Sequence, residues 1–337
     1  MEKQILKSGG ILTVDEHAIV CRFPSPRLVL STSAFNGGYI VATAVFNQCL
    51  DIFVNSENEL PGGSMKEYLS IKANEQALHI QKSTGLLTSA RMHCRGFSMM
   101  EFDGIIVEVI ATAGVDKNAV RAGDPASYYE DSNGYQSIGG TINIIALTNV
   151  QLPQGTMAKA LLSITEAKTA ALQELAVVSP FTLHSATGTG TDGIMIACDP
   201  ESTVLLTDTG TQSKLGELLC QAVKIAIKQS LAKECAIEPL GEGRATRRLQ
   251  KLGISGIKGL ELPLSSPQDK ILLAMYQSIW QEYSWGLLSV EDIVGFISLL
   301  EEPIMQPLGG LLSMVLRKKM DKTFYDERMN QYSGGVL

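Results

Sequence analysis

The chain lacks several features that would assign it to a class at once. None of its six cysteines forms a Cys-x-x-Cys pair, and no cysteine–histidine spacing matches a structural zinc site. The segment Met1–Gln4 has no signal-peptide core, and no apolar run reaches the ~18 residues of a membrane span. Free thiols in a reducing compartment are the simplest account of the cysteines. We therefore expect a soluble cytoplasmic protein without a metal site.

An excess of positive charge is also missing. The chain has 28 lysines and arginines against 35 acidic residues, a formal net charge of -7 and a pI near 5.3. This balance argues against a protein that follows nucleic-acid phosphates. The one compact basic run, Arg317–Lys319, is followed by Asp321, Asp326 and Glu327, which is typical of a solvated helix end. No nucleic-acid partner is expected.

What the chain has is enough apolar sequence for a large core. Its 337 residues are 45% hydrophobic, and this length suggests two domains. From residue 10 to about 210, short apolar runs alternate with glycine and Asp/Asn turns, a pattern typical of strands. The runs are Ile19–Cys21, Leu28–Leu30, Tyr39–Val41, Ile105–Ile110, Ile142–Leu147 and Ile194–Ala197.

Two amphipathic helices are predicted among these strands, over about Gly155–Leu175 and Thr211–Lys233. Strands mixed with long helices predict an α/β or α+β domain, a mixed sheet with packed helices, over residues 1–235. A glycine-containing basic stretch predicts a linker over 236–262.

Residues 263–337 are predicted to form an all-helical C-terminal extension. Ser266–Asp269 and Ser289–Asp292 carry helix-opening signals, and Pro303 ends the second of these helices. A third helix is expected over Leu308–Lys319. The apolar residues of the C-terminal helices suggest packing on the first domain, on a second copy in a homo-oligomer, or on a partner.

The most unusual segment is the Gly/Thr loop, Ser185–Gly193. Its Gly188-x-Gly190-x-x-Gly193 spacing matches the dinucleotide fingerprint, but that motif must open a helix, whereas a strand follows here. A nicotinamide enzyme is therefore the weakest interpretation. The loop offers N–H groups, hydroxyls and the Asp192 carboxylate, which suit a polar ligand or an oxyanion. A tight turn with local hydrogen bonds is equally consistent.

Several single residues allow both a structural and a functional interpretation. Lys168 lies on the apolar stripe of the first helix, so it either snorkels past the core or pairs with an acid in a site. Asn143 interrupts an apolar run and must be paired, as a core hub or as a ligand contact. His184 lies beside the Gly/Thr loop and could be a general base, although a lone histidine near a loop is more often structural. Asn36–Gly38 predicts a hairpin turn.

Taken together, several segments resemble the adenosylcobinamide amidohydrolase family. They lie in the family order between about residues 30 and 200, and the resemblance does not extend past about residue 235. The segments are Phe35–Gly38, Asn47, Gly85–Ala90, Thr112–Val115, Asn118–Ala119, Gly140–Ile144, Thr165–Ala171 and Ala186–Asp192.

The resemblance implies hydrolysis of the amide that joins the aminopropanol arm to the corrin ring of adenosylcobinamide, and in some members of complete cobamides. The products, adenosylcobyric acid and 1-amino-2-propanol, would serve cobamide salvage. The cobalt corrinoid is then the substrate, and no cofactor is expected. Amide hydrolysis needs a base or nucleophile, oxyanion donors and an acid for the leaving amine.

We assign those roles as hypotheses. The catalytic candidates are Asp192 or Glu166 as base, Lys168 as charge holder or proton donor, and Thr191 and His184. The substrate-binding candidates are Asn36, Gly37, Gly38, Thr88, Thr141, Asn143, Thr187, Gly188, Thr189 and Gly190.

Three alternatives stay open. Gly140-Thr141 resembles a junction at which some hydrolases cleave themselves to expose a threonine nucleophile. A non-catalytic corrinoid-binding or chaperone protein on the same scaffold would use the C-terminal region for docking. An amidohydrolase of another substrate class would use the Gly/Thr loop on a different amide.

Overall fold

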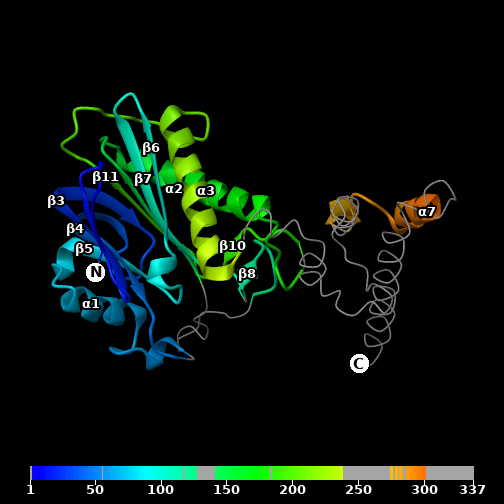
Figure 1. The fold of residues 1–337 in the computed structure, drawn as a ribbon, viewed down its shortest axis with the longest axis horizontal. Helices are drawn as coiled ribbons and strands as arrows, with labels where there is room; N and C mark the ends of the chain where they lie inside the picture. Colours follow the sequence, from blue (N-terminus) through cyan, green and yellow to red (C-terminus); the bar gives the residue numbers. More distant parts are fainter. Residues whose placement is uncertain are drawn as a thin grey trace. The chain divides into compact units, whose positions relative to one another are not determined.

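The computed structural model describes two separate parts of the chain. They are residues 2–54, 56–116, 118–126, 141–182 and 184–237, and then 274–275, 278–279, 281–283 and 286–300. By Cα proximity the chain divides into two compact units, Met1–Pro239 and Leu240–Leu337 (Figure 1). Nearly all of the predicted linker 236–262 and most of the predicted helical extension 263–337 lie outside the described residues.

In the second unit, helix α7 (Val290–Leu300) begins where the sequence predicts it. The Ser289 hydroxyl accepts a hydrogen bond from the Asp292 N–H, and the Asp292 carboxylate accepts one from the Ser289 N–H. This reciprocal pair satisfies two N–H groups that a helix start leaves open.

The first unit is built on a curled mixed sheet. Among the described residues, nine strands belong to it, in the order β1-β2-β3-β11-β9-β7-β6, with β4 between β3 and β5. Only β9–β11 and β4–β5 are parallel pairs within this part of the chain. The strands are β1 (Glu2–Ile5), β2 (Ile11–Val14), β3 (Ala18–Ser31), β4 (Gly38–Cys49), β5 (Ser83–Thr88), β6 (Gly96–Phe102), β7 (Ile105–Ala113), β9 (Ile142–Thr148) and β11 (Gly193–Cys198). A small ribbon joins β8 (Ala119–Val120) to β10 (Gly188–Thr189).

Strand β3 corrects one prediction. The runs Ile19–Cys21 and Leu28–Leu30, expected as separate strands, belong to one strand of 14 residues. Its pairing with β4 shifts register between Arg22 and Arg27, around Pro24 and Pro26. Proline cannot donate to a ladder and is tolerated at such irregularities, which explains why the sequence looks like two strands.

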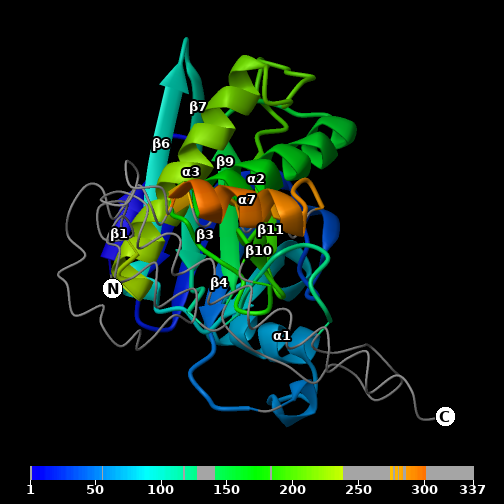
Figure 2. The ribbon, with the colours of Figure 1, turned by 90° about the vertical axis from the view of Figure 1, so that its right-hand side faces the viewer.

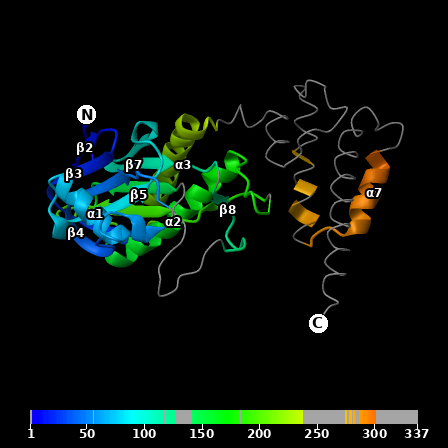
Figure 3. The ribbon, with the colours of Figure 1, turned by 90° about the horizontal axis from the view of Figure 1, so that it is seen from below.

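The helices lie on two sides of the sheet. Helices α2 (Gln154–Glu174) and α3 (Lys214–Cys235) confirm the two predicted helices. Helix α1 (Met65–Glu75), which the sequence analysis missed, packs against β5 on the other side (Figure 3). In the described part of the first unit, short turns of 3-10 helix cover Glu57–Glu59, Ile80–Lys82 and Met92–Cys94. Helix α1 buries only Tyr68, Leu69 and Ala73, so its apolar stripe is too narrow to stand out in the sequence.

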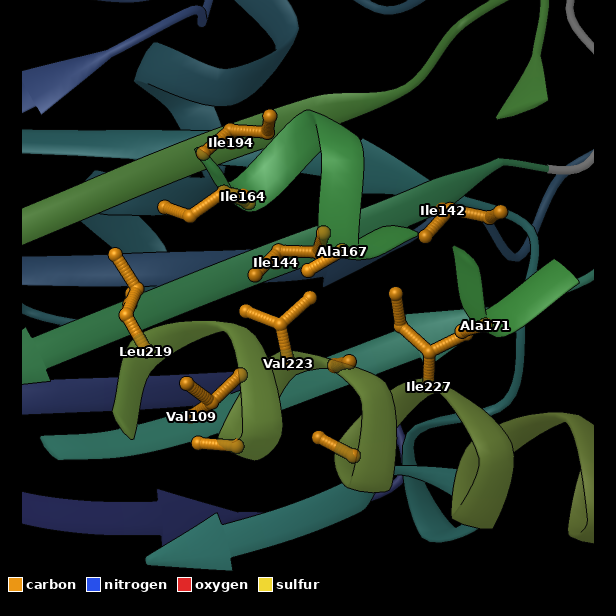
Figure 4. Close-up of a cluster of buried hydrophobic side chains, with 14 of the residues drawn as sticks. Val109, Ile142, Ile144, Ile164, Ala167, Ala171, Ile194, Leu219, Val223 and Ile227 are labelled. Atoms are coloured by element: carbon orange, nitrogen blue, oxygen red, sulfur yellow. The ribbon is translucent and has the colours of Figure 1, made fainter. Parts of the chain in front are cut away.

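The main core lies between the sheet and helices α2 and α3. Ile142 and Ile144 of β9 face Ala167 of α2 and Val223 of α3 (Figure 4). Since side chains alternate along a strand, Asn143 and its neighbours of the same parity point to the opposite face. On that face lies a second cluster of buried side chains, which contains Leu12, Val45, Leu86, Ile110, Ile145 and Met195.

Helix α3 approaches the β6–β7 hairpin very closely (Figure 2). A Cβ placed on Gly96 of β6 would lie closer than 3.0 Å to the backbone carbonyl group of Ala226, a separation that real Cβ atoms essentially never show. Only glycine allows the two backbones to meet in this way.

Candidate active site

A cavity of about 100 Å³ lies on the sheet face opposite α2 and α3, and we call it the site cavity. It is formed where the amino ends of β9 and β11 meet β5, α1 and the loop after β3. Five predicted site residues line it: Thr88, Thr141, Asn143, Thr191 and Asp192. The remaining wall consists of Thr32, Ser33, Ala34, Leu50, Met65, Leu69, Gly85, Leu86, Leu87, Ser89 and Gly193.

The Asp192 carboxylate is the most heavily bonded group of the site. It accepts from Lys168 Nζ, from the Thr189 hydroxyl, from the Thr189 N–H at 3.0 Å and from the Ile142 N–H at 3.1 Å. The Lys168 and Asp192 side chains are only 9% and 10% exposed. The inward lysine of α2 therefore pairs with an acid of the Gly/Thr loop, one of the two interpretations that the sequence left open.

Gly188 is required by this ion pair. A Cβ at that position would lie 2.6 Å from Lys168 Nζ and closer still to the Asp192 carboxylate. The loop then continues into strand β11 and not into a helix, which confirms that its glycines are no dinucleotide fingerprint. The glycine at position 188 is explained by this contact, because a side chain there would obstruct the approach of Lys168 to Asp192.

A buried chain of amides runs along one wall of the site cavity. Asn143 Nδ2 donates to Asn47 Oδ1 at 2.7 Å and to the Leu87 carbonyl at 3.0 Å. Asn47 Nδ2 in turn donates to the Thr112 hydroxyl at 2.8 Å. All three side chains are 1–2% exposed. Asn143 is thus a hydrogen-bond hub, and it also lines the cavity, so its two interpretations are compatible.

Asn143→Leu is expected to lower the free energy of unfolding by about 1–3 kcal/mol, because it leaves the buried Asn47 Oδ1 without a donor. Chemical denaturation of the wild type and the variant measures this difference. The double variant Asn47→Leu/Asn143→Leu removes both partners and should recover part of the loss. Wild-type stability in the single variant would contradict the hub role.

The structure does not bring the residues Asn36 to Gly38 into the site cavity. Asn36, with φ +51°, donates through Nδ2 to the carbonyl groups of Ile80 and Ser83 at 2.7 and 2.8 Å. Gly37 packs against the Ser33 carbonyl, and Gly38, with φ +80°, opens β4. These residues lie in the connection between the antiparallel strands β3 and β4, which agrees with the predicted hairpin turn.

Two catalytic candidates also lie away from the cavity wall. Glu166 is exposed on the other side of α2 and lines a separate groove with Lys159, Asp208 and Ser213. His184 lies near Arg121 and Asp124, and burial together with the Arg121 charge lowers its pKa. Although burial alone would raise the pKa of Asp124, hydrogen bonds from Ser179, the Arg121 N–H and Thr182 lower it.

Of the other loop candidates, Thr189 donates hydrogen bonds to the Asp192 carboxylate. Thr187 is bonded to the segment that follows β8 and to helix α2. The Thr187 hydroxyl accepts from the Ala122 N–H at 2.8 Å, and its carbonyl accepts from the Thr169 hydroxyl at 3.1 Å. Gly190 lies in the turn before Asp192, with open space where a Cβ would be. These residues shape the loop that carries Asp192.

The sequence analysis missed most of the apolar wall of the cavity, including Met65 and Leu69 of α1. It also missed Ser89, although Gly85–Ala90 is one of the segments that carry the family resemblance. Among the described residues of both units, no three His, Cys, Asp or Glu side chains group so that they could hold a metal ion. In the same residues, no helix has the length and apolar content needed to cross a membrane.

Fold and site together define an α+β protein in which a buried lysine–aspartate pair supports a small cavity lined by the Asn143 amide, several hydroxyls and apolar side chains. The chain belongs to the adenosylcobinamide amidohydrolase (CbiZ) family, which it matches over residues 5–239. This confirms the resemblance found in the sequence.

Two further proteins are similar to this chain. It is 36% identical over 187 residues to the uncharacterized protein MJ1613 of Methanocaldococcus jannaschii, which covers 51% of this chain and 72% of that protein. The crystal structure of the PH0078 protein from Pyrococcus horikoshii aligns with a TM-score of 0.33 at 12% identity, over 69% of this chain and 81% of that one.

Proposed function

We propose that this protein hydrolyses the amide that joins aminopropanol to the corrin ring in adenosylcobinamide. Water adds to the amide carbonyl, the C–N bond breaks, and the products are adenosylcobyric acid and 1-amino-2-propanol. Family membership supports the general role of an adenosylcobinamide amidohydrolase. The reaction would feed a scavenged corrinoid back into cobamide synthesis.

The observation that carries the proposal is the size and lining of the site cavity. Pockets that enclose a whole drug-sized ligand measure roughly 300–1,000 Å³, whereas this one measures about 100 Å³. It cannot enclose a corrin ring, but it suits a slender amide arm that projects from one. The reacting amide would enter while the ring stays outside.

The polar groups of the wall suit an amide arm. Among the described residues, no donor pairs with Asn143 Oδ1, because the hydrogen bonds of this side chain run through Nδ2. That oxygen can therefore accept from the N–H of the substrate amide. Leu50, Met65 and Leu69 offer apolar contacts to the carbon chain of the arm.

Incubation of the purified full-length protein with adenosylcobinamide, followed by liquid chromatography with mass detection, tests the proposal. We expect adenosylcobyric acid and free aminopropanol in equal amounts. Unchanged adenosylcobinamide with folded protein would overturn the proposal. A spectral titration with corrinoids and a panel of other amides would then separate a binding protein from a hydrolase of another substrate class.

A further inference from the structure

The Thr88 hydroxyl is a buried donor of the site cavity that has no acceptor among the described residues. Thr88 is the last residue of β5, lines the cavity and is 3% exposed. Its hydroxyl oxygen accepts a hydrogen bond from the Ala90 N–H at 3.0 Å, and this is the one bond of the side chain in the described part of the chain. A hydroxyl also carries a proton to donate, and leaving it unpaired in a buried place costs free energy. A ligand in the cavity would accept it.

The other hydroxyls of the cavity wall either donate within the protein or lie at its surface. Thr32, Ser33 and Thr141 each donate to a backbone carbonyl group. Ser89 and Thr191 are exposed, so water can reach them. The hydroxyl at the end of β5 differs from all of these, because it is buried and its proton has no acceptor in the described residues.

The described cavity wall holds no free base that could turn Thr88 into a nucleophile. Asp192 alone among these wall residues has a side chain that ionises near neutral pH. A carboxylate offers about four lone-pair sites, and Asp192 already accepts four hydrogen bonds. The self-cleavage considered from the sequence involves Gly140, which lies outside the described residues. Thr88 therefore keeps its proton and acts as a hydrogen-bond donor.

The position of this donor is fixed by its neighbours. The Leu50 N–H donates to the Thr88 carbonyl at 2.7 Å, and the Ala90 N–H occupies one lone pair of the hydroxyl. A β-branched side chain also has restricted rotation about its first bond. A donor that is fixed before the reaction needs no reorganisation when charge develops on its acceptor, which is what makes an oxyanion donor effective.

Asn143 brings a complementary acceptor to the same cavity from another strand. Its Nδ2 donates to the carbonyl of Leu87, the residue before Thr88, at 3.0 Å. A Cβ on Gly193 would lie 2.7 Å from both Asn143 Oδ1 and a methyl carbon of Leu86. Leu86 and Thr88 share a face of β5, because they are two residues apart. A donor from β5 and an acceptor from β9 match a secondary amide, whose carbonyl accepts and whose N–H donates.

We propose that the Thr88 hydroxyl donates to the carbonyl oxygen of the substrate amide, while Asn143 Oδ1 accepts from the amide N–H. The oxygen of water bonds to the amide carbon, and the C=O electron pair moves onto the oxygen that Thr88 holds. The C–N bond then breaks, the carbonyl forms again, and a proton of the water passes to the leaving nitrogen. Thr88 keeps its own proton throughout.

This contact should be stronger in the tetrahedral intermediate than in the bound substrate. A hydrogen bond to an ionised acceptor is roughly twice as strong as one between neutral groups, and the acceptor becomes an oxyanion only after water has added. Thr88 would thus contribute more to kcat than to binding. The role in turnover rests on the proposed function, whereas the recognition of a secondary amide does not.

Thr88→Val keeps the shape of the side chain and removes the donor. In the adenosylcobinamide assay its kcat should fall by about 10²–10³-fold, the usual loss for one oxyanion donor, with a much smaller change in KM. Thr88→Ser keeps the hydroxyl and should retain most of the activity. If Thr88→Val does not fold, Thr88→Cys replaces it, because its thiol is of similar size but a weak donor; its kcat should also fall.

Thr148→Val is the matched control. Thr148 is also a buried threonine at the end of a strand and donates to the Ile106 carbonyl at 2.9 Å, but it does not line the cavity. Its kcat and KM should stay at wild-type values. Circular dichroism melts establish that each variant is folded.

A titration with N-(2-hydroxypropyl)propanamide, followed by NMR on the full-length protein, tests the recognition without any turnover. This small amide carries the aminopropanol arm but no corrin ring. The wild type and Thr148→Val should bind it alike, and Thr88→Val should bind it about 2- to 10-fold more weakly, the loss expected for one neutral hydrogen bond.

The two assays distinguish a failure of this inference from a failure of the proposed function. Turnover of adenosylcobinamide with a wild-type kcat in Thr88→Val would overturn the inference and leave the proposed function standing. Amide binding that depends on Thr88, without turnover of any corrinoid, would support the recognition and overturn the proposed function. A wild type that does not bind the amide, or equal amide binding by the wild type and Thr88→Val, would overturn the inference.

Discussion

Lys168→Met should abolish turnover and lower the free energy of unfolding by about 3–5 kcal/mol, the usual cost of removing one member of a buried ion pair. The Asp192 carboxylate would remain 10% exposed with no cation beside it. It would also hold the Ile142 N–H and the Gly/Thr loop less firmly. Denaturant titration and the adenosylcobinamide assay measure the two effects.

Two companion variants separate the structural from the functional part of this effect. Lys159→Met removes a lysine of the same helix whose ion pair with Asp208 is exposed, and it should change stability and turnover little. Lys168→Met/Asp192→Asn removes both charges, so it should be more stable than Lys168→Met while staying inactive. If the double variant recovers turnover, the pair has only a structural role.

Gly96→Ala should have a comparable effect on stability with no direct effect on the site. Overpacking a core costs typically about 1–3 kcal/mol, and sometimes more. Here the neighbour is the backbone carbonyl of Ala226, which cannot rotate away as a side chain would. We expect a loss at or above the upper end of that range, seen as a lower melting temperature.

Gly155→Ala is the control for this substitution. Gly155 lies near the start of α2, and a Cβ there would meet nothing within 4 Å. Alanine favours a helix more than glycine does, so the melting temperature should stay the same or rise slightly. A wild-type melting temperature for Gly96→Ala would mean that α3 does not lie against β6 in solution.

Periodicity along the chain predicted the parts of the fold that bury a wide apolar face. Helices α2 and α3 and the central strands β7, β9 and β11 belong to this group. The narrow stripe of α1 hid that helix, and the prolines of β3 made one strand look like two. Strands β1, β2, β5 and β6 were not predicted either, because their burial depends on neighbours distant in sequence. The mixed class of the fold was predicted, whereas the order of the strands was not.

The candidate site was predicted in its residue types more than in its grouping. Lys168 stood out as a cation on an apolar face and Asn143 as an amide in an apolar strand. In the structure, Lys168 pairs with Asp192 and Asn143 with Asn47. Glu166 and His184 were chosen because they are near other candidates in the sequence. In the structure, neither of them lines the site cavity. The partner of Asn143 is 96 residues away, and no local pattern points to Asn47.

The alternation of strand β9 serves two surfaces: Ile142 and Ile144 fill the core, whereas Asn143, together with Thr141 just before the strand, forms part of the cavity wall. Its ladders with β7 and β11 align Ile142 with Ala113 and Asn143 with Gly193. Gaining or losing one residue within this strand would exchange the two faces, with isoleucine in the cavity and an amide in the core. Single substitutions along β9 preserve this alternation, whereas an insertion or a deletion within the strand does not. Among relatives, the number of residues in this segment should therefore vary less than the identity of those residues.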